Sequence, residues 1–85
     1  MYAIDWSPRA RRQLAKLGDR EIQRRLFEAI GLLAGFPRVA GLEALRNHRC
    51  GYRLRVGRYR VLLDVDTSSG IVLVQEIRKR DERTY

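Results

Sequence analysis

The chain has 85 residues, 18 of them basic and 10 acidic, which gives a formal net charge of +8 at pH 7. One cysteine excludes an internal disulfide, and one cysteine with one histidine cannot complete a zinc site. The chain has no apolar run of about 18 residues and no signal-peptide pattern, so we expect one cytoplasmic domain over residues 1–85, without metal or cofactor.

The first 18 residues predict a short strand followed by a helix. Residues 2–6 are expected to form a short first strand, and Ser7 and Pro8 then form a helix start. A serine hydroxyl caps free backbone N–H groups, and proline at the first helical position loses no hydrogen bond. Gly18 is expected to end this helix.

A second helix is predicted over residues 20–34, with Asp19 as its N-cap. Its apolar residues recur at helical spacing and form one stripe that should face the core. The stripe consists of Ile22, Leu26, Ile30 and Leu33, widened by Phe27 and Ala29. Residues 36–50 show no clear periodicity and are expected to be a connection.

Three strands are predicted in the second half of the chain. Gly57 and Arg58 form a two-residue loop with glycine first, which favours a type II′ hairpin turn. That turn sets the cross-strand pairs: Val56 with Tyr59, Leu54 with Val61 and Tyr52 with Leu63 on one face, Arg55 with Arg60 and Arg53 with Leu62 on the other. The last strand, residues 71–77, begins apolar on both faces, as a central strand does. The expected fold is α+β: an N-terminal strand and a two-helix hairpin packed on one face of a mainly antiparallel four-stranded sheet.

The hairpin carries an arginine-rich face. No carboxylate occurs from residue 46 to residue 60, and Arg55 opposite Arg60 is a like-charge pair that destabilises a hairpin on its own. A phosphate that bridges the two guanidinium groups would offset this cost. The alternative is a solvated sheet face. The run Arg78-Lys79-Arg80 extends the same patch if the last strand lies beside the hairpin, and is otherwise a basic tail.

Few residues could act as catalytic acids, bases or nucleophiles. His48 is the single histidine, and a lone histidine in a loop is more often a surface residue than a general base. Asp64 lies on the arginine side of its strand and could pair with an arginine there. There is no glycine-rich phosphate loop and no serine nucleophile motif. An enzyme of this kind would act by electrostatic stabilisation and positioning. RNA permits this because it carries its own nucleophile, the 2′-hydroxyl.

The chain resembles the RelE/ParE superfamily of toxins from bacterial type II toxin–antitoxin systems, over nearly all its length. The resemblance rests on residues 4–10, the helix-ending Gly35-Phe36-Pro37, the hairpin of residues 52–61, and the ending of residues 78–85. RelE-like members are ribosome-dependent endoribonucleases that cut mRNA. ParE-like members inhibit DNA gyrase and lack the catalytic set.

The resemblance implies the RelE-like activity, because the catalytic positions of that group are occupied here by Arg53, Arg55, Arg60, Arg80 and Tyr85. The arginines would bind the scissile phosphate and stabilise its charge, with Arg80 as clamp or leaving-group acid. Tyr85 would stack on a base or accept the 2′-hydroxyl proton. Further RNA contacts are expected from Arg58, Arg78 and Lys79. Arg53 and Arg55 depart from the family, which often has lysine at both positions, and arginine is a poor proton donor at neutral pH.

The resemblance also implies partners. They are the ribosome with its mRNA, and an acidic, partly disordered antitoxin from the same operon, in a hetero-oligomeric complex that binds operator DNA through the antitoxin. No membrane partner is expected. Two alternatives remain open: a gyrase inhibitor that cleaves nothing, and a non-toxic nucleic-acid-binding module. The basic outer faces of the helices either contact ribosomal RNA or form a solvated surface; their residues include Arg9, Arg11, Arg12, Arg24 and Arg25.

Overall fold

A computed structural model of the protein describes residues 1–80. The elements follow one another as β1 (Ala3–Trp6), α1 (Pro8–Ala15), α2 (Arg20–Gly31), the 3-10 helix η1 (Leu32–Gly35), β2 (Leu42–Ala44), β3 (Tyr52–Val56), β4 (Tyr59–Asp66) and β5 (Ile71–Lys79). No helix in this part of the chain is long and apolar enough to cross a membrane.

Both helices begin where the sequence predicts. The Ser7 hydroxyl accepts a hydrogen bond from the Ala10 N–H at 3.0 Å, and the Asp19 carboxylate caps α2 in the same way. The end of α1 was predicted wrongly at Gly18, because the helix stops at Ala15. The Gln23 amide from α2 donates to carbonyl oxygens at residues 14 and 17, so a tertiary contact satisfies the end of α1 instead of a glycine cap.

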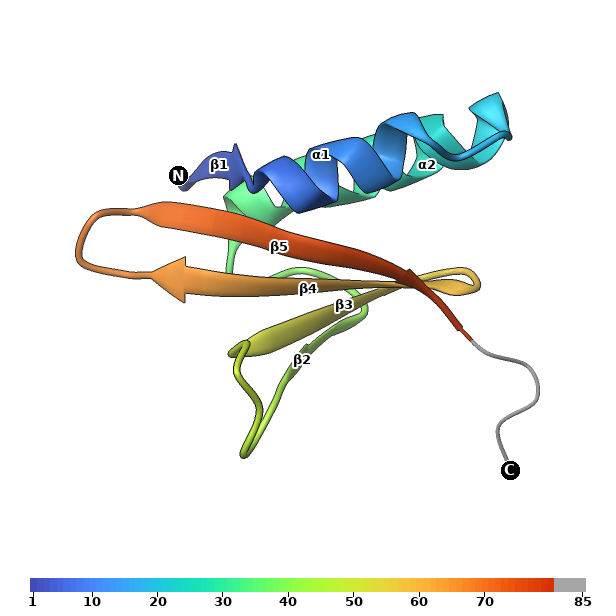
Figure 1. Cartoon of the computed structure of the whole chain (residues 1–85). Helices are drawn as coiled ribbons and strands as arrows, with labels where there is room; N and C mark the ends of the chain where they lie inside the picture. The colour runs from blue at the N-terminus through green and yellow to red at the C-terminus, as the bar shows by residue number, and fades with distance from the viewer. Residues whose placement is uncertain (81–85) are drawn as a thin grey trace.

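The sheet has five strands in the order β1-β5-β4-β3-β2, with β1 parallel to β5 and every other pair antiparallel. The α+β prediction is confirmed, but the strand count is corrected from four to five. The added strand is β2, within the segment predicted as a connection. A strand of three residues is too short to show the apolar–polar alternation by which strands are predicted. It is defined by its pairing with β3, which the sequence of the segment itself does not reveal. Figure 1 shows β2 beside β3, at the edge of the sheet opposite β1.

The hairpin between β3 and β4 has the predicted register, including Arg55 opposite Arg60. Gly57 has φ of +57°, and Asn47 is the one non-glycine with positive φ among residues 1–80. Arg58 therefore has negative φ, as a type II′ turn requires. The signs of φ at Gly57 and Arg58 agree with the predicted type II′ turn, and the predicted register is confirmed.

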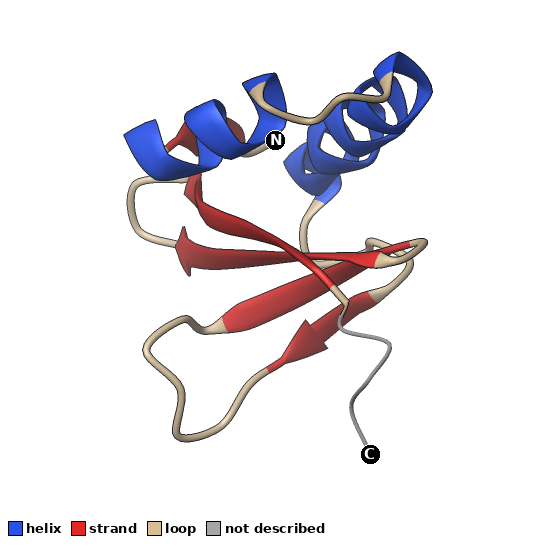
Figure 2. Cartoon of the chain, turned by 45° about the vertical axis from the view of Figure 1, so that its right-hand side comes forward, coloured by secondary structure: helices blue, strands red, loops and turns tan. Residues whose placement is uncertain are grey.

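The core lies between the helical layer and one face of the sheet (Figure 2). Leu26, Ile30 and Leu33 are buried in it, as the helical stripe predicts. Phe27 was predicted wrongly, since its side chain is 61% exposed. It stacks on the ring of Trp6 from β1 at a centroid distance of 6.2 Å, and Trp6 is itself only partly buried against the core.

Candidate functional site

Three arginines form a cross-strand row on the sheet face opposite the helices. Arg55 on β3 pairs in register with Arg60 on β4, and Arg60 pairs with Arg78 on β5. Their neighbours Leu54, Val61 and Ile77 point into the core, so strand alternation turns the arginines outward. Adjacent strands lie about 4.8 Å apart, so the row places the Cα atoms of the three arginines within roughly 10 Å of one another.

Arg53 lies beside this row and is less free than the sequence suggests. It faces Glu43 of β2 in register, and the two side chains form an ion pair. The Arg53 side chain is only 24% exposed. The expectation of an uncompensated arginine face is therefore corrected, because the unpredicted strand β2 brings in a carboxylate from outside the hairpin.

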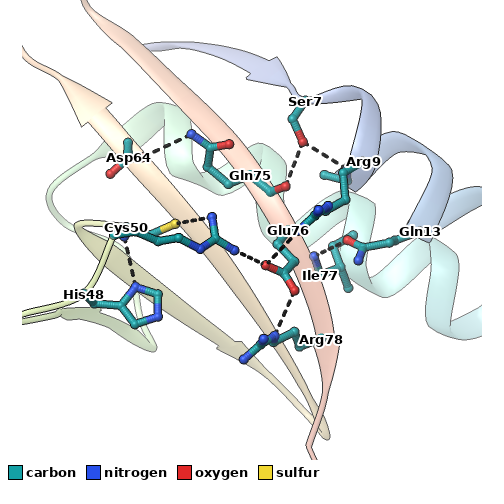
Figure 3. Close-up of polar contacts among 12 residues, drawn as sticks. Ser7, Arg9, Gln13, His48, Cys50, Asp64, Gln75, Glu76, Ile77 and Arg78 are labelled. Carbon is teal, nitrogen blue, oxygen red and sulfur yellow. Dashed lines mark hydrogen bonds and ion pairs between the residues drawn. The ribbon is translucent and has the colours of Figure 1, made fainter.

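Glu76 is a second carboxylate on this face, and sequence reasoning missed it. It is buried, with 6% exposure, and follows a β-bulge on β5 in which Gln75 is the extra residue. Its Oε2 accepts a hydrogen bond from Arg78 Nε at 2.8 Å, and its Oε1 forms ion pairs with Arg49 and with Arg9, the latter at 3.7 Å. Figure 3 shows Arg9 and Arg78 directed toward this carboxylate. The available signal was a single carboxylate placed directly before the apolar Ile77 and two residues from Arg78, since a buried charge must be paired.

The arginines keep Glu76 ionised. Burial raises the pKa of the Glu76 carboxyl, but the hydrogen bond and charge of Arg78 and the charge of Arg49 outweigh it and hold that pKa below its ordinary value. The side chain is thus a fixed negative charge within the cationic face.

The basic run at the end of β5 divides between the two faces. Lys79 pairs in register with Tyr59 and lies on the helix side, where it lines a pocket of about 370 Å³ with Arg25 and Arg58. Arg80 is exposed, and its backbone N–H donates to the Arg58 carbonyl at 2.6 Å. Of the run, Arg78 alone joins the row in cross-strand register. Tyr85 lies outside the described residues.

The loop between β2 and β3 is held against the same face. Asp64 accepts hydrogen bonds from the Gly51 N–H at 2.7 Å and the Gln75 amide at 3.2 Å. The expectation that Asp64 pairs with an arginine is therefore wrong within residues 1–80. The carboxylate instead anchors the loop, because the Gly51 N–H lies closest to it.

His48, the histidine weighed as a general base, and the neighbouring Cys50 have structural roles in this loop. His48 Nδ1 accepts a hydrogen bond from the Cys50 N–H at 2.9 Å. Cys50 is buried, and burial followed by the charge of Asp64 raises the pKa of its thiol, which disfavours the reactive thiolate. Among residues 1–80, no group of three His, Cys, Asp or Glu side chains could hold a metal ion.

Comparison with known proteins identifies the class to which this fold and surface belong. Residues 4–84 match the family model described as the ParE toxin of the parDE type II toxin–antitoxin system. The protein is therefore a toxin of the type II toxin–antitoxin class. The chain belongs to the ParE toxin family, within the RelE/ParE superfamily that its residues resemble. No curated protein sequence matches it.

Solved structures share the fold along nearly the whole chain. The RelBE2 toxin–antitoxin complex of Mycobacterium tuberculosis has a chain 28% identical, with a TM-score of 0.80, over 93% of this chain and 98% of that one. The isolated RelE toxin of E. coli is 23% identical with a TM-score of 0.79, over 96% and 87%. The archaeal RelE–RelB complex of Pyrococcus horikoshii is 23% identical with a TM-score of 0.78, over 98% of each chain.

Proposed function

We propose that this toxin is a ribosome-dependent mRNA endoribonuclease, which inhibits translation in the cytoplasm. The observation that carries the proposal is the row of Arg55, Arg60 and Arg78 across three strands of an open sheet face. Glu76 offsets the charge of Arg78, but Arg55 and Arg60 remain a like-charge pair in register, and an anion that bridges these two arginines would offset their repulsion. The similarity to a toxin–antitoxin complex named RelBE2 supports the choice of the RelE-like activity.

In the proposed reaction the RNA supplies its own nucleophile. The 2′-oxygen attacks the adjacent phosphorus, the bond from phosphorus to the 5′-oxygen breaks, and a 2′,3′-cyclic phosphate forms. Arg53, Arg55 and Arg60 bind the phosphate and stabilise the negative charge that develops on it. Arg80 clamps the phosphate or protonates the leaving oxygen, and Tyr85 stacks on a base or accepts the 2′-hydroxyl proton. Arg58, Arg78 and Lys79 add contacts to the RNA backbone.

The proposal includes a cognate antitoxin. Structures of similar chains contain RelB antitoxins, in bacterial and archaeal complexes. For this protein we infer an acidic, partly disordered antitoxin that neutralises the net charge of +8 and forms a hetero-oligomer able to bind operator DNA. Co-expression with the neighbouring gene product should abolish growth arrest.

A second function, inhibition of DNA gyrase without cleavage, is favoured by one finding. The matching family model is described as the ParE toxin of the parDE system, and ParE-like toxins are the group that inhibits gyrase. In that case the exposed arginines would bind the target protein or its DNA. Arg60 would then contribute to the affinity for that target, and cellular mRNA would remain uncleaved.

One experiment separates the two functions. The protein is induced briefly in a bacterial host, and new mRNA 5′ ends are mapped across the genome beside a variant lacking Tyr85. Cuts that cluster within translated codons and vanish in the variant support the endoribonuclease. Growth arrest without such cuts, with DNA breaks and an SOS response, refutes it in favour of gyrase.

A further inference from the structure

Three arginines from three separate elements converge on the Glu76 carboxylate. Arg9 comes from the first turn of α1, Arg49 from the loop between β2 and β3, and Arg78 from β5. These elements lie far apart in the sequence, since Arg49 and Glu76 are separated by 27 residues. The loop of Arg49 is bonded to β4 through the Gly51 N–H and Asp64, which holds it against the sheet near this carboxylate.

The arginines retain donors for a further ligand. Each guanidinium group has five N–H bonds, and each uses only one nitrogen toward Glu76. The side chains of Arg9, Arg49 and Arg78 are 60%, 56% and 62% exposed, whereas that of Glu76 is 8% exposed. Three positive charges against one negative charge leave the cluster with a net charge of +2.

A recess lies beside the cluster, between the start of α1 and the loop before β3. It measures about 390 Å³ and is lined by Ser7, Pro8, Arg9, Arg49 and Gln75. The Ser7 hydroxyl is engaged, since it donates to the Gln75 carbonyl at 2.7 Å and accepts from Ala10. The two arginines therefore supply the charged donors of this recess.

We propose that Arg9 and Arg49 form a second phosphate-binding subsite for single-stranded RNA, and that Glu76 is the positioning residue that aligns them with the arginine row. The inference rests on the proposed function, since the ligand is the RNA strand whose scissile phosphate lies on the row. Arg78 belongs both to the row and to the cluster, so the two sites adjoin. The subsite receives a neighbouring phosphate of the same strand.

The two possible roles of Glu76 predict opposite effects of its replacement on the affinity for RNA. If Glu76 acted only through its charge, its replacement by neutral glutamine would make the face more positive and tighten RNA binding. If it positions the arginines, Glu76→Gln weakens binding although the net charge rises by one, because the guanidinium groups lose their alignment. The direction of the change therefore separates the two roles.

The first test is binding of a five-nucleotide, 2′-O-methyl RNA, followed by fluorescence anisotropy between 50 and 200 mM salt. Each lost phosphate contact should reduce the slope of log K against log salt by about 0.7. We expect Arg49→Gln and Arg9→Gln to show this loss, with affinity roughly 3- to 10-fold weaker, and Glu76→Gln to bind roughly 3-fold more weakly than the native chain. Arg20→Gln, on the exposed first turn of α2, is the charge-matched control, and thermal unfolding verifies that each variant is folded.

The second test is cleavage kinetics on programmed ribosomes. A subsite away from the scissile phosphate contributes equally to substrate and transition state, so Arg49→Gln should raise KM and leave kcat within about 2-fold. The inference is overturned if Arg60→Ala impairs cleavage while the Arg49 and Glu76 variants match Arg20→Gln. If the native chain neither binds RNA nor cleaves it, the proposed function fails and the subsite fails with it.

Discussion

Arg60 occupies the middle of the arginine row, with Arg55 on one side and Arg78 on the other. We expect Arg60→Ala to reduce cleavage on programmed ribosomes by about 100-fold or more, because the central charge on the scissile phosphate is lost. The melting temperature should change by no more than about 3 °C, since the variant also removes like-charge repulsion. Arg20→Ala is the matched control. Native activity in a folded Arg60→Ala protein would refute the phosphate-binding role of the row.

Glu76 gives a pH-dependent contribution to stability. Its pKa is lowered in the folded protein, so the contribution is present above the ordinary value of 4.5 and is lost as pH falls through the folded pKa. Glu76→Gln should therefore lower the melting temperature at pH 7 by roughly 5 °C, and this difference should shrink steadily below pH 4.5. Thermal unfolding of both proteins from pH 3 to pH 7 measures it. A difference that is constant with pH would assign the loss to packing rather than to charge.

At the scale of elements, two glycines differ in whether their backbone conformation suits a residue with a side chain. Gly57 holds φ of +57° in the hairpin turn, whereas Gly31 ends α2 with helical φ of −59° and open space where a Cβ would lie. Gly57→Ala should cost about 1–2 kcal/mol, because an L-residue is strained at positive φ. Gly31→Ala should gain about 0.5–1 kcal/mol from its better helix propensity.

Chemical denaturation of these two variants measures both changes in the free energy of unfolding. The pair forms its own control, since each variant adds one methyl group to an exposed glycine. Equal effects of the same sign would show that the turn tolerates a side chain. The type II′ geometry would then not be what sets the register of the arginine row.

The whole molecule carries +8 on 85 residues, and its cationic face concentrates part of that charge. Self-repulsion should destabilise the fold at low ionic strength, so the melting temperature should rise by a few degrees between 20 and 300 mM sodium chloride. At equal ionic strength, phosphate should raise it further by binding the folded state. A melting temperature that falls with added salt would show that the ion pairs of Glu76 and Glu43 outweigh the repulsion.

Local chemistry explains how much of the fold could be predicted from sequence. Ser7 and Asp19 cap helices through neighbouring backbone groups, and Gly57 sets the hairpin register through its own φ. The pairing of Arg55 with Arg60 follows from that turn and strand alternation. These features depend on residues a few positions apart, so the order of the chain determines them. The resemblance to the RelE/ParE toxins followed from the same segments.

The tertiary structure alone decided the electrostatics of the site. Glu43 reaches Arg53 through a strand too short to be predicted, and Glu76 meets Arg9 and Arg49 from distant elements. Strand alternation alone puts Lys79 and Arg78 on opposite faces of the sheet. The pocket that Lys79 lines beside α2 depends on how the helical layer packs on the sheet. Such contacts depend on packing between whole elements rather than on local backbone preference. The sequence by itself therefore determined which charges the sheet carries, and the fold determined which of them are offset.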